Sequence, residues 1–174
     1  MKLQTLEGMG TRPTTDRIKE NLFNILAPYI INSKVLDLFA GSGSLGIEAL
    51  SRGAESAVFS DRNEKCIKII KNNLEHAKIA EKAGVFLGEA VVILKKLSQH
   101  RQKFDIIFLD PPYKKGIVPQ ILQHLEENDV LDEKFIIIAE TDISDELPES
   151  MGCLIISKIQ VYGSTKLTFY KRNI

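Results

Sequence analysis

Short apolar runs alternate with amphipathic helical stretches along most of this chain, and this alternation limits its fold more than any other feature. The apolar runs, which we expect to be strands, cover residues 35–40, 57–60, 85–87, 104–109 and 135–139. The stretches between them carry apolar residues at helical spacing and cover residues 41–53, 63–80, 90–97 and 117–125. Neighbouring parallel strands need a crossover connection, which is usually a helix. The alternation therefore predicts an α/β fold with a mostly parallel sheet and helices on both faces.

The two ends of the chain depart from this alternation. Apolar residues recur at helical spacing over residues 14–31, which predicts an amphipathic helix ahead of the first strand. Near the other end, strand-like runs at residues 154–161 and 166–170 flank a Gly-Ser pair with no helix between them. This spacing predicts a terminal antiparallel hairpin.

The composition defines the class of protein only broadly. At 174 residues with 44% hydrophobic content, the chain suits a single domain over residues 1–174, in which residues 1–32 border the functional site. Twenty-three basic and 23 acidic residues cancel, so any contact with a nucleic acid must rely on a local basic patch. The two cysteines and three histidines lack metal-ligand spacing, so we expect no metal site and no disulfide framework. Without a signal-like start or an apolar run of membrane length, the chain is expected to be cytoplasmic and independent of membranes.

A glycine loop follows the first predicted strand. Gly41, Gly43 and Gly46 have the spacing Gly-x-Gly-x-x-Gly, and Asp61 closes the next strand, where a carboxylate can accept hydrogen bonds from ribose hydroxyls. This pattern suits NAD as well as other adenosine ligands. Asp37 lies four residues before the loop and would repel a pyrophosphate, whereas S-adenosylmethionine has no phosphate and carries a sulfonium and an ammonium. We therefore expect S-adenosylmethionine as the cofactor, with hydrogen bonding to the loop amides as the alternative role of Asp37.

The expected cofactor site extends beyond the loop. Glu89 follows the strand at residues 85–87, where an acceptor for the adenine amino group is needed, and it is equally consistent with the first-turn acid of the next helix. The residues that we expect at the cofactor are Asp37, Phe39, Ala40, Gly41, Ser42, Gly43, Asp61, Arg62, Glu89 and Ala90.

The strand at residues 104–109 ends in the sequence Asp110-Pro111-Pro112-Tyr113. The carboxyl ends of strands in open α/β sheets are where ligands bind, and two prolines hold the Asp110 carboxylate and the Pro111 carbonyl in set directions. Two such acceptors can hold the two hydrogens of an exocyclic nucleobase amine, and Tyr113 offers a ring on which the base can stack. We expect these four residues to be catalytic. The alternative is a strand end followed by a rigid turn, with Asp110 as a turn or cap residue.

These motifs together resemble those of the class I S-adenosylmethionine-dependent methyltransferases. Residues 11–26 (TRPTTDRIKENLFNIL), 36–54 (LDLFAGSGSLGIEALSRGA) and 161–165 (VYGST) resemble the bacterial family that methylates N2 of one guanine in 16S small-subunit ribosomal RNA. The resemblance covers nearly the whole chain. It implies a Rossmann-like fold with a seven-stranded sheet and a final antiparallel strand, S-adenosylmethionine as donor, and a guanine in ribosomal RNA or in a small-subunit assembly intermediate as acceptor.

The same resemblance assigns a substrate-binding role to the N-terminal segment. Arg12, Pro13 and Thr14 are expected to meet the donor or the target base together with Tyr113, whereas without the resemblance they would be a proline-marked helix start. Members of this family usually have an extra basic strand ahead of the equivalent of Lys2 and Leu3, so we expect weaker RNA binding from this chain. We expect a monomer.

Other functions are compatible with the same motifs. A DNA adenine-N6 methyltransferase would use the same Asp-Pro-Pro-Tyr chemistry, although the chain has no room for a separate target-recognition domain. A protein-glutamine methyltransferase is less favoured because its motif resembles Asn-Pro-Pro-Tyr, whereas this chain has Asp110. A non-catalytic RNA-binding module and an NAD-dependent oxidoreductase are the alternatives from other classes, and binding of the methyl donor would distinguish both from a methyltransferase.

Overall fold

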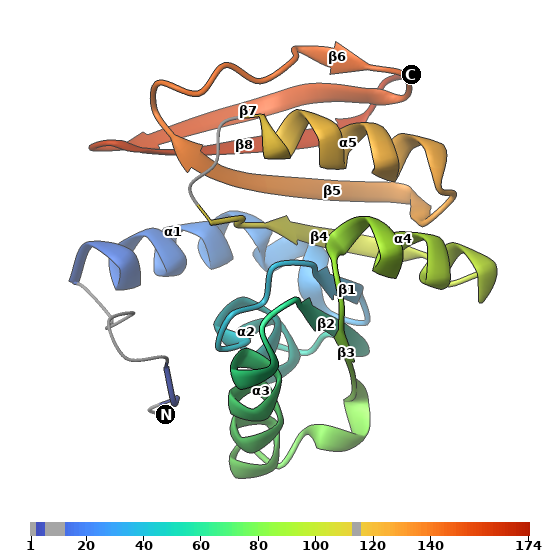
Figure 1. The fold of residues 1–174 in the computed structure, drawn as a ribbon. Coiled ribbons are helices and arrows are strands. Elements are labelled where there is room, and N and C mark those ends of the chain that lie inside the picture. The colour runs from blue at the N-terminus through green and yellow to red at the C-terminus, as the bar shows by residue number, and fades with distance from the viewer. Residues whose placement is uncertain (1–2, 6–12, 113–115) are drawn as a thin grey trace.

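The computed structural model describes residues 3–5, 13–112 and 116–174, which contain eight strands. The strands are β1 (Lys34–Asp37), β2 (Ser56–Asp61), β3 (Ala83–Leu87), β4 (Phe104–Leu109), β5 (Leu131–Asp142), β6 (Ser150–Met151), β7 (Leu154–Tyr162) and β8 (Thr165–Arg172). They form one sheet in the order β3-β2-β1-β4-β5-β8-β7-β6 (Figure 1). The first five strands in this order are mutually parallel, and β8, β7 and β6 follow, each antiparallel to the strand before it. The predicted fold class is confirmed, and the two-residue strand β6 is an addition to the seven predicted strands.

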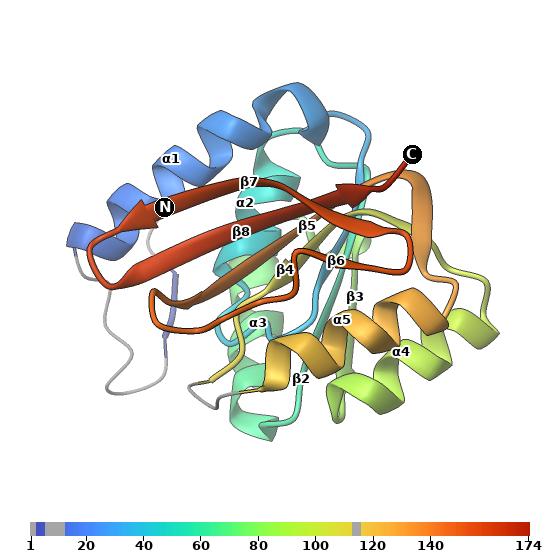
Figure 2. The same ribbon diagram turned by 90° about the horizontal axis from the view of Figure 1, so that it is seen from above.

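Helices cover both faces of the sheet. The helices are α1 (Pro13–Ile30), α2 (Ser44–Ser51), α3 (Glu64–His76), α4 (Ala90–Gln99) and α5 (Ile117–Glu127), with a short 3-10 helix η1 (Ala80–Lys82). The apolar sides of α1, α2 and α3 pack on one face and those of α4 and α5 on the other (Figure 2). None of these helices is long and apolar enough to cross a membrane.

Strand β4 shows why the central strands read as continuous apolar runs in the sequence. Its residues Ile106 and Phe108 belong to the core on the α1 side, whereas Ile107 and Leu109 belong to the core on the α5 side. Alternate side chains of a strand point to opposite faces, so a strand buried on both faces has no polar alternation. Phe108 packs against Phe23 of α1 with 5.9 Å between ring centroids, which holds α1 against the sheet.

Several element boundaries differ from those predicted. Strand β1 ends at Asp37 rather than at residue 40, because residues 38–43 turn away to form the glycine loop. Helix α3 ends at His76, and Lys78 has a positive φ of 61°, which breaks the helix before the predicted end at residue 80. Strand β5 is much longer than residues 135–139, because it pairs with β4 on one side and with β8 on the other.

The order of the strands determines where a ligand can bind. Strand β1 lies between β2 and β4, and the chain leaves β1 toward β2 and β3 before it returns to β4 on the opposite side. The carboxyl ends of β1 and β4 therefore form a topological switch point, which is the usual ligand site of an open α/β sheet. Figure 1 and Figure 2 both show the beginning of α1 on the same side of the molecule as the carboxyl end of β4.

Candidate active site

The glycine loop joins β1 to α2 at the switch point. Gly41 and Gly43 have φ angles of 58° and 82°, in the left-handed region that favours glycine. The Gly41 amide donates to Oδ2 of Asp61 at 3.0 Å, and the Asn63 amide donates to Oδ1 of the same carboxylate at 2.9 Å. Asp61 therefore orders both the loop and the beginning of α3. Each of its carboxylate oxygens keeps further acceptor capacity, so it can also accept from a ligand hydroxyl.

Asp37 is the most unusual group at this edge. Its side chain is buried, with 2% of the residue exposed, and its Oδ2 accepts from the Gly46 amide at 3.1 Å. The pKa of Asp37 is raised from 3.8 to about 7, and burial is the largest cause. The Gly46 hydrogen bond acts in the opposite direction, and the charge of Asp61 adds to the effect of burial. Within the described residues, no basic side chain forms an ion pair with Asp37. A cationic ligand at this edge would supply the missing counter-charge.

Gly46 allows α2 to approach β2 closely enough to present this amide. A Cβ at Gly46 would lie 2.3 Å from Cε1 of Phe59, whose ring is fully buried. Any side chain at residue 46 would therefore push α2 away from the sheet. The third glycine of the loop thus sets the packing distance between helix and sheet and, through it, the position of the donor to Asp37.

The other expected cofactor residues lie along the same edge. The loop residues Phe39, Gly41 and Ser42 are half-buried, and Ala40 and Gly43 are buried. Arg62 is exposed after β2, and the exposed Glu89 occupies the N-cap position of α4 without a side-chain capping bond, followed by the half-buried Ala90. The end of β3 adjoins Asp61, because Leu87 is paired with it and the Gly88 amide donates to its carbonyl oxygen at 3.0 Å. The structure thus brings the Asp61 and Glu89 regions together.

Asp110 follows β4 and lies on the other side of β1 from Asp61. The residue is exposed, Pro111 is half-buried and Pro112 is exposed. Loss of hydration raises the pKa of the Asp110 carboxyl well above its usual range. Glu140 raises this pKa further through its charge and a side-chain hydrogen bond, and the charge of Asp37 adds to the effect. Asp110 therefore has two other carboxyl groups, those of Glu140 and Asp37, as neighbours at this edge of the sheet.

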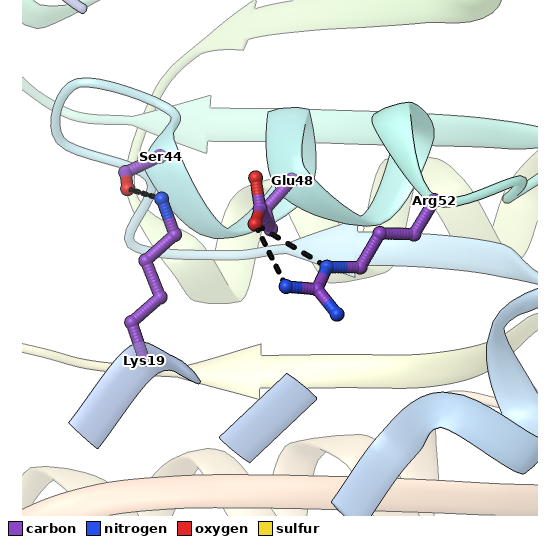
Figure 3. A network of polar contacts seen from close by, with 4 residues as sticks. All are labelled: Lys19, Ser44, Glu48 and Arg52. Carbon is purple, nitrogen blue, oxygen red and sulfur yellow. Dashed lines mark hydrogen bonds and ion pairs between the residues drawn. The ribbon is translucent and has the colours of Figure 1, made fainter. Parts of the chain in front are cut away.

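The remaining expected residues lie in or next to segments outside the described residues. Tyr113 and Arg12 are in these segments, and Pro13 and Thr14 are described only as the first backbone positions of α1. Further along this helix, Nζ of Lys19 donates to Oγ of Ser44 at 2.8 Å (Figure 3). Ser44 is the first residue of α2, so α1 is joined to the helix that follows the glycine loop.

Two residues at this edge were not predicted from the sequence. Glu140 lies on β5 next to Asp110, because Leu109 and Ala139 are paired in the parallel register of β4 and β5. The signal for Glu140 was the one used for Asp110, an acid directly after a buried apolar run. Asn73 is buried in α3, and its Nδ2 donates to the Ser42 carbonyl at 2.9 Å. The signal for Asn73 was a polar residue on the inward face of an amphipathic helix.

Asn73 also holds the beginning of the described chain. The Gln4 amide donates to Oδ1 of Asn73 at 2.8 Å, and Nδ2 of Asn73 donates to the Gln4 carbonyl at 3.1 Å. One side chain therefore imitates the pairing of a neighbouring strand for Gln4 while it bonds the glycine loop through Ser42. Both hydrogens of Nδ2 are donated and Oδ1 accepts one, which explains why a buried polar residue is tolerated on the inward face of α3.

A parallel core in the order β3-β2-β1-β4-β5, a glycine loop after β1, an acid at the end of β2 and added antiparallel strands define the class I methyltransferase fold. The family model described as "Conserved hypothetical protein 95" matches residues 1–171. The chain belongs to this family, as the resemblance of its motifs predicted.

Individual relatives are similar over nearly the whole chain. "Putative rRNA methyltransferase YlbH" of Bacillus subtilis is 42% identical over 98% of this chain and 92% of its own length. "Ribosomal RNA small subunit methyltransferase D" of Escherichia coli K12 is 35% identical over 98% of this chain and 84% of its own length. A solved structure, "Putative methyltransferase yhhF from Escherichia coli", superposes with a TM-score of 0.84 at 34% identity and covers 99% of this chain and 92% of that one.

Proposed function

We propose that this protein transfers a methyl group from S-adenosylmethionine to the exocyclic N2 amine of a guanine in small-subunit ribosomal RNA. The observation that carries the proposal is the position of Asp110. Its carboxyl group lies at the switch point, close enough to Asp37 for the Asp37 charge to raise its pKa. It directly precedes two prolines at the edge of the sheet that also carries the glycine loop. The names of the relatives support ribosomal RNA as the acceptor.

The edge of the sheet suits this donor. Asp37 is a buried carboxyl without a cationic partner in the described chain, and Gly43 has a backbone conformation that only glycine adopts easily. S-adenosylmethionine supplies an electrophilic methyl group on a sulfonium and brings an ammonium that can neutralise a carboxylate. We assign Asp61 to the ribose hydroxyls and Glu89 to the adenine amino group. Leu87 is 54% exposed at the same edge and offers an apolar surface for the adenine ring.

The acceptor must be held so that its nitrogen approaches the methyl carbon in line with the sulfur. A guanine stacked in a helix cannot do this, so an unpaired or extruded base is required. The Asp110 carboxylate and the Pro111 carbonyl accept the two hydrogens of the amine and orient its nitrogen, which is how positioning supplies much of the rate. As the N–C bond forms, the C–S bond breaks and its electron pair stays on sulfur. The amine becomes acidic only then, and its proton passes to Asp110 or to water.

The direct test is methyl transfer to small-subunit ribosomal RNA. Labelled donor would be incubated with RNA and with partly assembled subunits from a strain that lacks this protein, and the product nucleoside identified by mass spectrometry. We expect N2-methylguanosine. Asp110→Ala should reduce kcat by about 100-fold or more while donor affinity changes little. Asp129→Ala is the matched control, because Asp129 is an exposed aspartate in a surface ion pair with Lys103.

Each outcome has a clear meaning. N6-methyladenosine in place of N2-methylguanosine would replace the proposed acceptor with an adenine. Tight donor binding without transfer to any of these RNAs would refute the acceptor class. Unchanged turnover in Asp110→Ala would remove the catalytic role of this residue, and a chain that does not bind the donor at all would not be a methyltransferase.

A further inference from the structure

Asp110, directly after β4, and Glu140, on β5, are neighbouring carboxyl groups at one edge of the parallel core. The pairing of Leu109 with Ala139 places the two acids side by side, one residue beyond the paired positions. The charge of Glu140 and a side-chain hydrogen bond with it help to raise the pKa of Asp110, as expected for two carboxyl groups placed this close together. The proposed reaction uses Asp110 and leaves Glu140 without a role.

A purely structural role explains Glu140 poorly. Two carboxyl groups in contact repel one another when both are ionised, and the charge of Asp37 adds to this repulsion at Asp110. Within the described residues, no lysine, arginine or histidine forms an ion pair with Glu140. An apolar or amide side chain at residue 140 would avoid this cost. The arrangement favours a ligand that brings two or more adjacent hydrogen-bond donors to the pair.

We propose that Glu140 accepts a hydrogen bond from N1–H of the target guanine while Asp110 accepts from its N2 amine, so that Glu140 selects guanine over other purines. This inference rests on the proposed function. The pairing edge of guanine presents N1–H and the N2 amine side by side, and RNA-binding proteins commonly read unstacked bases at this edge. Two adjacent carboxylates match two adjacent donors.

The same geometry disfavours other purines. The corresponding edge of adenine presents an amine next to an unprotonated ring nitrogen, whose lone pair would face one of the carboxylates. 2-Aminopurine is the sharper probe, because it keeps the C2 amine that would be methylated and lacks the hydrogen on N1. A site built to accept a hydrogen leaves its own group unsatisfied when that hydrogen is missing, which is an effective basis for discrimination.

The experiment compares guanine and 2-aminopurine at one position. An RNA fragment that the wild-type protein methylates would be synthesised with either base at the methylated position, and kcat/KM measured for wild type, Glu140→Gln and Glu133→Gln. Glu133 is an exposed residue near the other end of β5 and serves as the matched control. We expect wild type and Glu133→Gln to prefer guanine by about 10-fold or more, the range for one hydrogen bond to a charged group. In Glu140→Gln the preference should shrink to about 3-fold or less, because an amide can accept from N1–H or donate to N1.

A structural role for Glu140 would lower both rates and leave their ratio unchanged, and that result would overturn the inference while the proposed function stands. If wild type transfers no methyl group to any guanine-containing RNA, the proposed function fails and the role of Glu140 fails with it. If Glu140→Gln does not fold, Glu140→Asp takes its place. Its carboxylate is one methylene shorter, so the same loss of guanine preference is expected, and an unchanged preference would again overturn the inference.

Discussion

Replacing Asp37 with asparagine should stabilise the ligand-free protein, and the gain should grow with pH. The asparagine side chain would have nearly the shape of a protonated aspartate, and its amide oxygen could still accept from the Gly46 amide, which is 3.1 Å from Oδ2 of Asp37. At low pH the wild-type carboxyl is neutral, so the two side chains should be close to equivalent. At higher pH the wild-type carboxyl ionises in a buried position, whereas the amide cannot.

The size of the effect follows from the pKa of Asp37. For an acid whose pKa is raised by folding, the stability it contributes is present below the unfolded pKa and is lost as pH rises through the folded pKa. A change from 3.8 to about 7 corresponds to a loss of roughly 4 kcal/mol at pH 8, of which somewhat less than half has already occurred at pH 5. The stabilisation by Asp37→Asn should therefore be about 2–3 kcal/mol larger at pH 8 than at pH 5.

Urea unfolding of both proteins at pH 5 and pH 8, followed by circular dichroism, measures this difference. Asp129→Asn is the control, because the Asp129 carboxylate is exposed in its ion pair with Lys103 and should give the same small change at both pH values. If the stabilisation by Asp37→Asn is equal at pH 5 and pH 8, Asp37 does not carry a raised pKa. The proposal that a cationic ligand neutralises the buried Asp37 carboxylate would then be wrong.

Two further predictions concern the same edge. The affinity for S-adenosylmethionine should rise about tenfold per pH unit up to a pH of about 7 and level off above it, because the bound ammonium requires ionised Asp37. Calorimetric titration of wild type should show this slope. If the slope persists in Asp37→Asn, another group causes it. Gly46→Ala should lower the free energy of unfolding by about 1–3 kcal/mol, because the new Cβ would lie 2.3 Å from Phe59. Thermal unfolding checks this against Gly84→Ala, where the nearest atom is the half-buried Phe86 ring at 3.3 Å, and equal losses in the two variants would contradict the packing explanation.

The alternation of strands and helices was predictable because each central strand is buried on both faces. Strand β4 was predicted with its observed bounds, since the sequence changes from apolar residues to Asp110 where the sheet ends. Element ends that depend on tertiary contacts were less accurate. The extent of β5 depends on its pairing with β8, which lies far away in sequence, and β6 is too short to give any periodic signal.

The candidate site was only partly accessible from the sequence. Asp61 and Asp110 were selected from the sequence because each is an acid at the end of a predicted strand, and Asp37 was selected because it lies four residues before the glycine loop, where it would repel a pyrophosphate. Glu140 also follows a predicted strand but lies inside an observed one, and the pairing of β4 with β5 is what places it next to Asp110. The sequence marks Asn73 only as a polar residue on the inward face of a helix, and its two backbone partners could not be predicted because they are distant in sequence.

The double role of Asn73 connects the beginning of the chain with the glycine loop thermodynamically. Its amide bonds Gln4 and Ser42 together, so the free energies of holding residues 3–5 in place and of holding the loop in its ligand-ready shape are not independent. Coupling between two sites is reciprocal, so any ligand that favours this loop shape must favour the docked N-terminal segment by the same factor. A partner that binds residues 3–5 in another position must therefore lower the affinity for that ligand by the same factor.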